Sequence, residues 1–296
     1  MSTLIVGSSG KIGRYLVKYL KGNAIFTYNK HIIKKGIKFD ILKDDINKII
    51  DKKKIQKIII LSGISSPDDC FKYKEMSRNI NIISTKKLIR KIIKKKLYFI
   101  FFSSEFVYDG SRGNYSENYP AKPINIYGKQ KFLIEKFINS KTKNCAIFRI
   151  GKTYGDELSD KSFVASFFNS LIKGKRVFNI AADQKLSPLY VKDLIKIIKI
   201  FLKKKIKGTY NIGGCEKISR YSSINNLINK FNYKNIKKIQ IYKSLLSNFQ
   251  FIDNRPLDVT MNISKLKKVI NFKMTDISKV GGKIIKDYNL NEKIFN

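Results

Sequence analysis

The chain has 296 residues, 43% of them hydrophobic, and its 61 Lys and Arg against 22 Asp and Glu give a formal net charge of +39. This length suffices for one large α/β domain, or for such a domain with a smaller lobe. No uncharged apolar run approaches the roughly 18–20 residues that span a bilayer. Lysines occur in nearly every segment beside abundant Ile and Asn, which favours solvated helix faces and biased codon usage over a nucleic-acid surface, although the field suits phosphate-bearing substrates.

The cysteines and the histidine argue against a metal centre and against secretion. Cys70, Cys145 and Cys215 are far apart and form no CxxC pair, and His31 is the single histidine. Such isolated thiols are typical of a reducing compartment, and the opening MSTLIVGSSGK has no basic stretch leading into an apolar one. We therefore expect a cytoplasmic protein without a metal, bound neither to a membrane nor to nucleic acid.

The first half of the chain alternates short apolar runs with helical patterns. Strands are predicted at 3–7, 24–28, 57–61, 97–103 and 145–150. Helices are predicted at 11–20, in one long pattern that follows 57–61 and ends near 95, and at 124–139. Buried strands that alternate with amphipathic helices predict a parallel sheet covered on both faces. Right-handed crossovers then give a doubly wound α/β (Rossmann) fold.

After about residue 155 this pattern loosens. Helices are predicted at 161–172, 192–204, 222–231 and 276–287, and a strand at 209–212. We predict a Rossmann domain over residues 1–155, to which about 188–213 returns as a late part of the sheet. The remainder of 156–296 is predicted to form a smaller substrate-binding lobe.

A glycine-rich turn follows the first strand and opens the first helix. Gly7, Gly10 and Gly13 stand in a GxxGxxG spacing that includes Lys11 and Ile12. Glycines permit a sharp turn and a close backbone approach to a pyrophosphate, and the helix N-terminus supplies free N–H groups with a partial positive charge. The position of the turn between a strand and a helix predicts a dinucleotide-binding site.

The end of the second strand indicates which dinucleotide is bound. An NAD enzyme usually places Asp or Glu there to bond the ribose 2′-hydroxyl. This chain has Tyr28-Asn29-Lys30-His31 instead, with Lys11 and Arg14 also near. Asn29 and Lys30 suit a 2′-phosphate, so we favour NADPH over NADH.

Three residues in the middle of the chain suggest hydride-transfer chemistry. Tyr127 and Lys131 form a YxxxK pair, which lies on one face of a helix. A neighbouring ammonium favours the phenolate and is expected to move the tyrosine pKa toward neutrality, as a proton donor to a ketone requires. Ser104 follows the strand at 97–103, and the carboxyl ends of parallel strands are where ligands bind.

The glycine turn, Ser104, Tyr127 and Lys131 together resemble an extended short-chain dehydrogenase/reductase. More specifically, SSEFVYDG (103–110) resembles the STDYVFDG segment of the dTDP-4-dehydrorhamnose reductase family. Further blocks resemble that family in order: YSENYPAKPINIYGKQKFLIE (115–135), FRIGKTYG (148–155), DQKLSPLYVKDL (183–194) and RPLDVTMNISKL (255–266). The resemblance covers nearly the whole chain. It implies an NAD(P)H-dependent reductase of a nucleotide-activated 4-keto sugar, in dTDP-rhamnose and polysaccharide biosynthesis, and a homodimer by analogy.

The resemblance also implies a role for each site residue. Ser104 would hold the keto oxygen, Tyr127 would donate the proton, and Lys131 would be its partner and reach the nicotinamide ribose. Glu105, where the family has Asp, would bind the sugar. Arg255 would grip the diphosphate with its guanidinium.

The remaining implied roles concern the cofactor and the backbone around it. They are Asp40 and Ile41 at the adenine, Ser62, Gly63 and Ile64 along the dinucleotide, and Asn81 as a support for the active-site backbone. Three positions depart from the family pattern: Lys152 stands where a substrate-stacking Trp is frequent, and Leu186 and Leu189 replace Gly and Thr. These departures leave the identity of the sugar open.

Two other functions use the same fold. An epimerase or dehydratase of a nucleotide sugar has the same Ser, Tyr and Lys but returns the hydride to its substrate. A non-catalytic regulatory subunit keeps the fold and acts on a partner. The intact Ser104, Tyr127 and Lys131 favour an enzyme.

Overall fold

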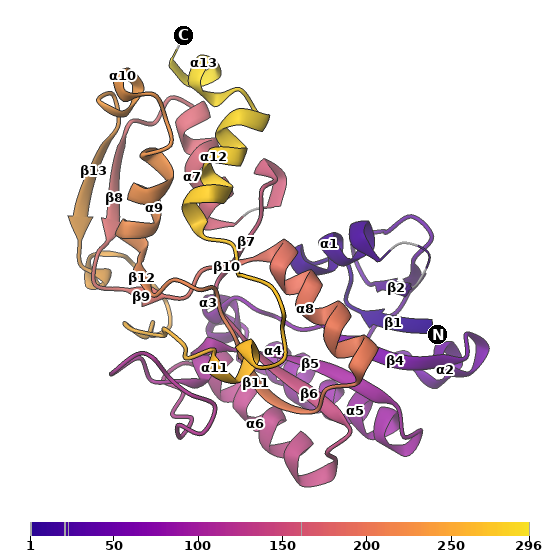
Figure 1. The fold of residues 1–296 in the computed structure, drawn as a ribbon. Coiled ribbons are helices and arrows are strands. Elements are labelled where there is room, and N and C mark those ends of the chain that lie inside the picture. Colours follow the sequence, from indigo (N-terminus) through magenta and orange to yellow (C-terminus); the bar gives the residue numbers. More distant parts are fainter. Residues whose placement is uncertain (1, 21, 23, 161, 296) are drawn as a thin grey trace.

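A seven-stranded parallel sheet forms the centre of the computed structural model, which describes residues 2–20, 22, 24–160 and 162–295. Its strands are β1 (Ser2–Val6), β2 (Ala24–Tyr28), β3 (Ile37–Lys38), β4 (Ile55–Ile60), β5 (Tyr98–Ser104), β6 (Cys145–Ile150) and β11 (Gly208–Ile212). They stand in the order β11-β6-β5-β4-β1-β2-β3, and all neighbours are parallel. The order reverses direction between β1 and β4, which confirms the predicted doubly wound Rossmann fold (Figure 1).

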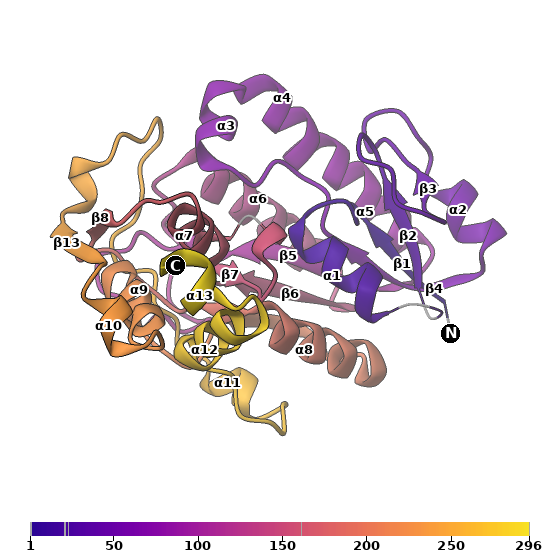
Figure 2. The same ribbon diagram turned by 90° about the horizontal axis from the view of Figure 1, so that it is seen from above.

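Two apolar layers cover the faces of this sheet. Helices α1 (Lys11–Tyr19) and α8 (Val191–Lys204) cover one face, and α2 (Asn47–Lys52), α5 (Thr85–Lys94) and α6 (Ile126–Lys141) cover the other. Figure 2 shows α5 and α6 on the opposite side of the sheet from α1 and α8. Neighbouring strand residues point to opposite faces, so Ile100 packs in the first layer, whereas Phe99 and Phe101 pack in the second.

The helix predicted between 61 and 95 is interrupted. The structure has α3 (Pro67–Lys72), α4 (Lys74–Arg78), a π-helical turn η1 (Asn79–Ser84) and then α5. Ser66 caps α3 by accepting a hydrogen bond from the Asp69 N–H at 3.2 Å. Tyr73 has non-helical backbone angles and separates α3 from α4. Apolar residues recur at helical spacing on both sides of Tyr73, so the hydrophobic periodicity alone did not show these breaks.

The late part of the chain builds a second apolar core beside the sheet. Its elements are α7 (Phe163–Ile172), β8 (Val177–Ala181), α9 (Arg220–Ile228), α10 (Tyr233–Ile236), β13 (Gln240–Ser244), α12 (Ile277–Asp287) and α13 (Leu290–Phe295). These elements gather at the upper left of Figure 1. The helix predicted at 161–172 begins at a position outside the described residues, and its remainder is α7. Dividing the chain at residue 155 stays a prediction.

The remaining elements are short. They are the 3₁₀ turns η2 (Glu105–Val107), η3 (Leu158–Asp160) and η4 (Leu246–Asn248), the paired strands β7 (Thr153–Tyr154) with β10 (Leu189–Tyr190) and β9 (Lys185–Leu186) with β12 (Ile218–Ser219), and α11 (Ser264–Lys267). Among the residues that the structure describes, no helix is both long and apolar enough to cross a membrane.

A buried ion pair joins helix α6 to strand β6. The Glu135 carboxylate accepts hydrogen bonds from Nε and Nη2 of Arg149, with a shortest distance of 2.7 Å, and from the Ser103 hydroxyl at 2.5 Å. The two side chains are 1% and 8% exposed, so their charges are desolvated and depend on each other. Nη1 of Arg149 donates to the Tyr108 hydroxyl at 2.9 Å and to the Glu117 carbonyl at 3.2 Å.

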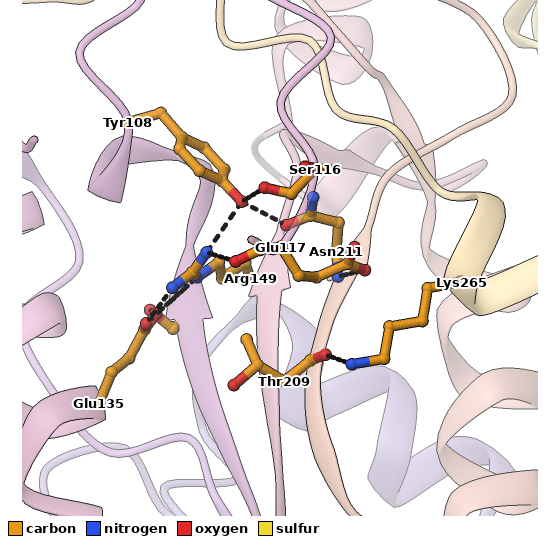
Figure 3. Close-up of polar contacts among 9 residues, drawn as sticks. Tyr108, Ser116, Glu117, Glu135, Arg149, Thr209, Asn211 and Lys265 are labelled. Atoms are coloured by element: carbon orange, nitrogen blue, oxygen red, sulfur yellow. Dashed lines mark hydrogen bonds and ion pairs between the residues drawn. The ribbon is translucent and has the colours of Figure 1, made fainter. Parts of the chain in front are cut away.

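The same network reaches strand β11. The Tyr108 hydroxyl lies 2.9 Å from Oδ1 of Asn211, and Nδ2 of Asn211 donates to the Tyr115 carbonyl at 2.8 Å. The Asn211 N–H donates to the Glu117 carboxylate at 2.8 Å. Figure 3 shows these groups meeting across β6 and β11, with Glu135 approaching from α6. The network therefore ties the late strand and α6 to the segment that follows β5.

We expect Glu135→Gln to lower the free energy of unfolding by about 3–5 kcal/mol, because it leaves the buried Arg149 charge without its carboxylate. Urea denaturation measures this loss. Glu157→Gln is the control, since it removes the exposed Lys18–Glu157 pair and should cost less than about 1 kcal/mol. Equal losses in the two variants would show that the buried pair contributes no more to the free energy of unfolding than the exposed pair does.

Candidate active site

A cleft of about 600 Å³ opens at the carboxyl ends of the central strands. At one end it is lined by Asn29 and Lys30, which follow β2, and at the other by Ser104 and Tyr127. The glycine turn after β1 lines the part between them. Ligands of doubly wound sheets bind at this edge, where the strand order reverses. The cleft therefore brings together segments that are far apart in the sequence.

Two of the three glycines are required by close backbone contacts. A Cβ at Gly7 would lie 2.7 Å from the backbone nitrogen of Ser62, and Gly7 has a φ of +90°. A Cβ at Gly13 would lie 2.3 Å from the carbonyl oxygen of Ser8. At Gly10, by contrast, the nearest atom would be 3.9 Å away. Packing inside the protein thus explains Gly7 and Gly13, whereas Gly10 leaves open space at the start of α1.

This geometry fits a nicotinamide dinucleotide. Gly10 is the N-cap of α1, so the N–H groups of Lys11, Ile12 and Gly13 have no acceptor within the helix and can bind a pyrophosphate. The hydroxyl of Ser62, which also lines the cleft, is buried without a hydrogen-bond partner in the described structure. A bound polyhydroxyl ligand would satisfy that hydroxyl.

The other predicted cofactor residues lie in the same cleft. It is lined by Asn29, Lys30, Asp40, Ile41, Gly63 and Ile64. Asp40 uses one carboxylate oxygen to accept the Leu42 N–H at 2.9 Å. Lys11 lines the cleft, but its ammonium donates to the Thr153 carbonyl at 2.9 Å. Arg14, which the sequence also placed near the cofactor, lines a separate hollow with Lys18 and Glu157.

Ser104 and Tyr127 meet at the opposite end of the cleft. Tyr127 is 8% exposed, and its ring packs edge-on against Phe106 at 6.3 Å between centroids. Burial raises the pKa of the Tyr127 phenol well above its usual range, and a hydrogen bond with the Ser104 hydroxyl offsets this only in part. The expectation of a lowered pKa was therefore wrong for this structure, because desolvation raises the pKa of the phenol and the charges of Cys70 and Glu105 add to that shift.

Lys131 lies one turn after Tyr127, and its ammonium is 5.7 Å from the centre of the Tyr127 ring. Its Nζ donates to the Phe102 carbonyl at 2.8 Å. Burial lowers the pKa of Lys131 to about 8, and the charges of Cys70 and Glu135 oppose this shift. Lys131 is therefore protonated at neutral pH but loses its proton much more readily than an exposed lysine.

Asn81 joins the cofactor side of the cleft to helix α6. Its Oδ1 accepts the Ile64 N–H at 2.8 Å, and its Nδ2 donates to the Ile64 carbonyl at 2.9 Å and to Oε1 of Gln130 at 2.7 Å. Gln130 in turn donates to the Ser77 hydroxyl at 2.8 Å. Asn81 lies in the π-turn η1, so that irregular turn brings it to the backbone segment that it was expected to support.

Glu105 and Lys152 line the cleft beyond Ser104. Oε2 of Glu105 accepts the Lys152 backbone N–H at 3.2 Å. Burial raises the pKa of Glu105 to about 8, opposed by the charges of Lys152 and Arg220. The pKa of Lys152 is lowered to about 8, first by burial and then by the charges of Arg220 and Lys11. Lys152 is open to solvent through the cleft although protein surrounds it.

Arg255 does not line the cleft. Its guanidinium pairs with the Asp68 carboxylate at 2.7 Å and lies 4.8 Å from the centre of the Phe251 ring. A diphosphate would have to compete with Asp68 for it, so the substrate role of Arg255 stays a prediction. Arg220, which the sequence reading did not single out, acts electrostatically on both Glu105 and Lys152. No local motif marks Arg220, because the fold of the late segment places it.

Within the described ranges no group of three or more His, Cys, Asp or Glu side chains could hold a metal ion.

Comparisons with known proteins relate the chain to one family. The family model described as RmlD substrate binding domain matches residues 1–289. Over 276 residues the chain is 24% identical to methionine adenosyltransferase 2 subunit beta of Xenopus tropicalis, covering 90% of this chain and 81% of that protein.

Two solved structures share the fold. A hypothetical dTDP-4-dehydrorhamnose reductase from Sulfolobus tokodaii is similar with a TM-score of 0.80 and 27% identity, over 94% of this chain and 98% of that one. The dTDP-4-dehydrorhamnose reductase of Bacillus anthracis, in complex with NADP, matches with a TM-score of 0.82 and 21% identity, over 97% and 99% of the two chains.

We expect Lys131→Met to stabilise the protein at pH 7 by about 1–3 kcal/mol, because it removes the cost of burying a charged ammonium. The folded pKa of about 8 lies below the ordinary 10.5, so the unfolded chain binds more protons between these values. The free energy of unfolding of the wild type therefore rises with pH through that window, as Lys131 loses its buried charge.

The gain of Lys131→Met over wild type should accordingly shrink as pH rises from 7 to 9.5, as followed by urea denaturation. Lys129→Met, at an exposed position of the same helix, is the matched control and should show no such trend. A pH-independent difference for Lys131→Met would contradict the lowered pKa.

Proposed function

We propose that this chain, which belongs to the RmlD substrate binding domain family, is a cytoplasmic NADPH-dependent reductase of a nucleotide-activated 4-keto sugar. One observation carries the proposal. Ser104 from β5 and Tyr127 and Lys131 from α6 converge at one end of a single cleft, and the glycine turn that suits a pyrophosphate lines the same cleft. Neither half alone would indicate hydride transfer, but together they provide a cofactor site and a proton donor.

The protonation state of Tyr127 suits the reducing direction. A phenol with a raised pKa keeps its proton at neutral pH, so Tyr127 can donate it to a ketone oxygen. The Ser104 hydroxyl holds that oxygen beside the phenol. A bound nicotinamide supplies the hydride. The phenolate left on Tyr127 then lies close to the Lys131 ammonium, which favours its charge.

Two further features support the choice of ligands. Asn29 and Lys30 follow β2 at the position where an NAD enzyme usually has Asp or Glu, although the Asp40 carboxylate, after β3, also lines the cleft. Among the relatives, the Bacillus anthracis reductase was solved with NADP, and both solved reductases are named for a nucleotide sugar. Gly10, Lys11, Ile12 and Gly13 would hold the pyrophosphate.

A regulatory subunit is the second candidate, because the Xenopus tropicalis relative is named as a subunit of methionine adenosyltransferase. Such a protein keeps the cleft but needs no turnover. An epimerase or dehydratase stays a third reading, since it would use the same three side chains without net consumption of the cofactor.

We expect the wild type to oxidise one NADPH for each 4-keto nucleotide sugar that it reduces, across a panel of dTDP- and UDP-linked substrates. Tyr127→Phe should lower kcat by about 10²–10⁴-fold, because it removes the proton donor, while NADPH binding is retained. Tyr242→Phe, at an exposed tyrosine, should leave kcat unchanged.

The alternatives give different results in this assay. Interconversion of sugars without net NADPH loss would favour an epimerase. No turnover, together with a cellular function that survives Tyr127→Phe, would favour the regulatory subunit. Unchanged kcat in Tyr127→Phe would contradict the assigned proton donor.

We expect Lys30→Asp to lower the ratio of kcat/KM with NADPH to kcat/KM with NADH by at least about 10-fold, because a carboxylate repels the 2′-phosphate. Lys34→Asp makes the same charge change at an exposed lysine that does not line the cleft, and should leave the ratio unchanged. A wild type that uses NADH better than NADPH would overturn the preference.

A further inference from the structure

A late segment of the chain binds the start of the helix that carries Tyr127. Oδ2 of Asp253 accepts the backbone N–H of Ile126, the first residue of α6, at 2.9 Å. An N–H at this position has no acceptor within its own helix. Asn125, which caps the helix, donates from Nδ2 to the Asn254 carbonyl at 3.1 Å. The late segment therefore holds both residues that directly precede Tyr127.

Asp253 is itself fixed by a third element, helix α3. Asp253 is buried, and its backbone N–H donates to Oδ1 of Asp68 at 3.1 Å. The same oxygen accepts the Ile252 N–H at 3.1 Å, and Oδ2 of Asp68 pairs with Arg255 at 2.7 Å. Oδ1 of Asp253 accepts the Asn254 N–H at 2.9 Å. Because these bonds order both its backbone and its carboxylate, Asp253 binds α6 with little further loss of conformational entropy.

The first turn of α6 also contacts the segment that holds Ser104. A Cβ at Gly128 would overlap the carbonyl oxygen of Phe106, so the helix backbone packs directly against the 3₁₀ turn η2. The Phe106 N–H donates to the Ser104 hydroxyl at 3.2 Å, and this hydroxyl is hydrogen-bonded to the Tyr127 phenol. The separation of Ser104 and Tyr127 thus depends on where the first turn of α6 lies.

We propose that Asp253 is a positioning residue for the reaction: its carboxylate holds the first turn of α6 so that the Tyr127 phenol stays beside the Ser104 hydroxyl. Asp253 does not line the cleft, so it acts through Tyr127 and not on the substrate or the cofactor. A displacement of about 1 Å in a reacting group can cost about 10²-fold in rate. The effect on turnover rests on the proposed function, whereas the placement of the phenol does not.

The kinetics of Asp253→Ala test this role with a 4-keto nucleotide sugar that the wild type reduces. We expect kcat to fall about 10- to 100-fold, while the Kd of NADPH stays within about twofold of wild type because the cofactor site is intact. Asp276→Ala is the matched control. Asp276 caps α12 by accepting the Lys279 N–H at 2.7 Å and does not line the cleft, so its loss should leave kcat unchanged.

A double-mutant cycle shows whether Asp253 acts through the phenol. In a Tyr127→Phe background the proton donor is already absent, so the further change Asp253→Ala should lower the residual single-turnover rate by less than about twofold. A residue that only stabilises the fold would lower both rates by the same factor.

A second readout follows the phenol without turnover. The protein is labelled with fluorotyrosine, and Tyr127→Phe assigns the Tyr127 signal in the fluorine NMR spectrum by its loss. Asp253→Ala should shift or broaden this signal, because the ring changes its position against Phe106, whereas Asp276→Ala should leave it in place. Asp253→Asn keeps one oxygen acceptor, so it should lie between wild type and Asp253→Ala in both readouts, and it serves as the test variant where Asp253→Ala does not fold.

The outcomes separate this inference from the proposed function. Equal losses of kcat in Asp253→Ala and Asp276→Ala would overturn the inference, because the loss of any helix cap would then explain the result. So would an unmoved Tyr127 signal, or an equal effect of Asp253→Ala with and without Tyr127. A Tyr127 signal that moves only with Asp253→Ala, in a protein that reduces no keto sugar, would support the placement of the phenol by Asp253 and contradict the reductase.

Discussion

The buried ion pair between Glu135 and Arg149 fixes helix α6 to strand β6, and residues that follow this strand line the cleft. Glu135 lies one turn after Lys131 and two turns after Tyr127, so the three share a face of the helix. Rotation or sliding of α6 would separate Glu135 from Arg149 and leave two desolvated charges unpaired, a cost of several kcal/mol. The position of the phenol and the ammonium in the cleft therefore follows from an interaction that lies outside it.

Burial then decides the charges inside the cleft. It raises the pKa of the Tyr127 phenol and brings that of the Glu105 carboxyl to about 8, and it lowers the pKa of the Lys131 and Lys152 ammonium groups to about 8. Each shift favours the uncharged form, as desolvation requires. A neutral phenol is ready to donate its proton, while both ammonium groups gain stability when negative charge develops or binds beside them. The same low-polarity surroundings thus suit the reduction that we propose.

The sequence could predict features that depend on local periodicity and spacing. Alternating apolar runs and helical patterns gave the parallel sheet, and the glycines were placed in a turn that the structure shows to be tightly packed. The direction of the Tyr127 pKa shift was wrong because spacing shows the neighbouring ammonium but not the depth of burial. The break at Tyr73 was missed because the apolar pattern continues through it. The substrate role of Arg255 was expected from the resemblance of its block, and its pairing with Asp68 could not be foreseen because the two residues are distant in the sequence.

The two ends of the cleft differ in how they are built, and this explains which part of the function the sequence reveals. The glycine turn, Ser104, Tyr127 and Lys131 come from strand ends and helix starts around one sheet, so a short motif marks each of them. Beyond Ser104, by contrast, Lys152 follows β6 and is influenced by the charge of Arg220, which begins a helix of the second core. Their meeting depends on how the late segment packs against the sheet. Lys152 and Arg220 are therefore electrostatic neighbours only in the tertiary structure, and no local motif marks the pair.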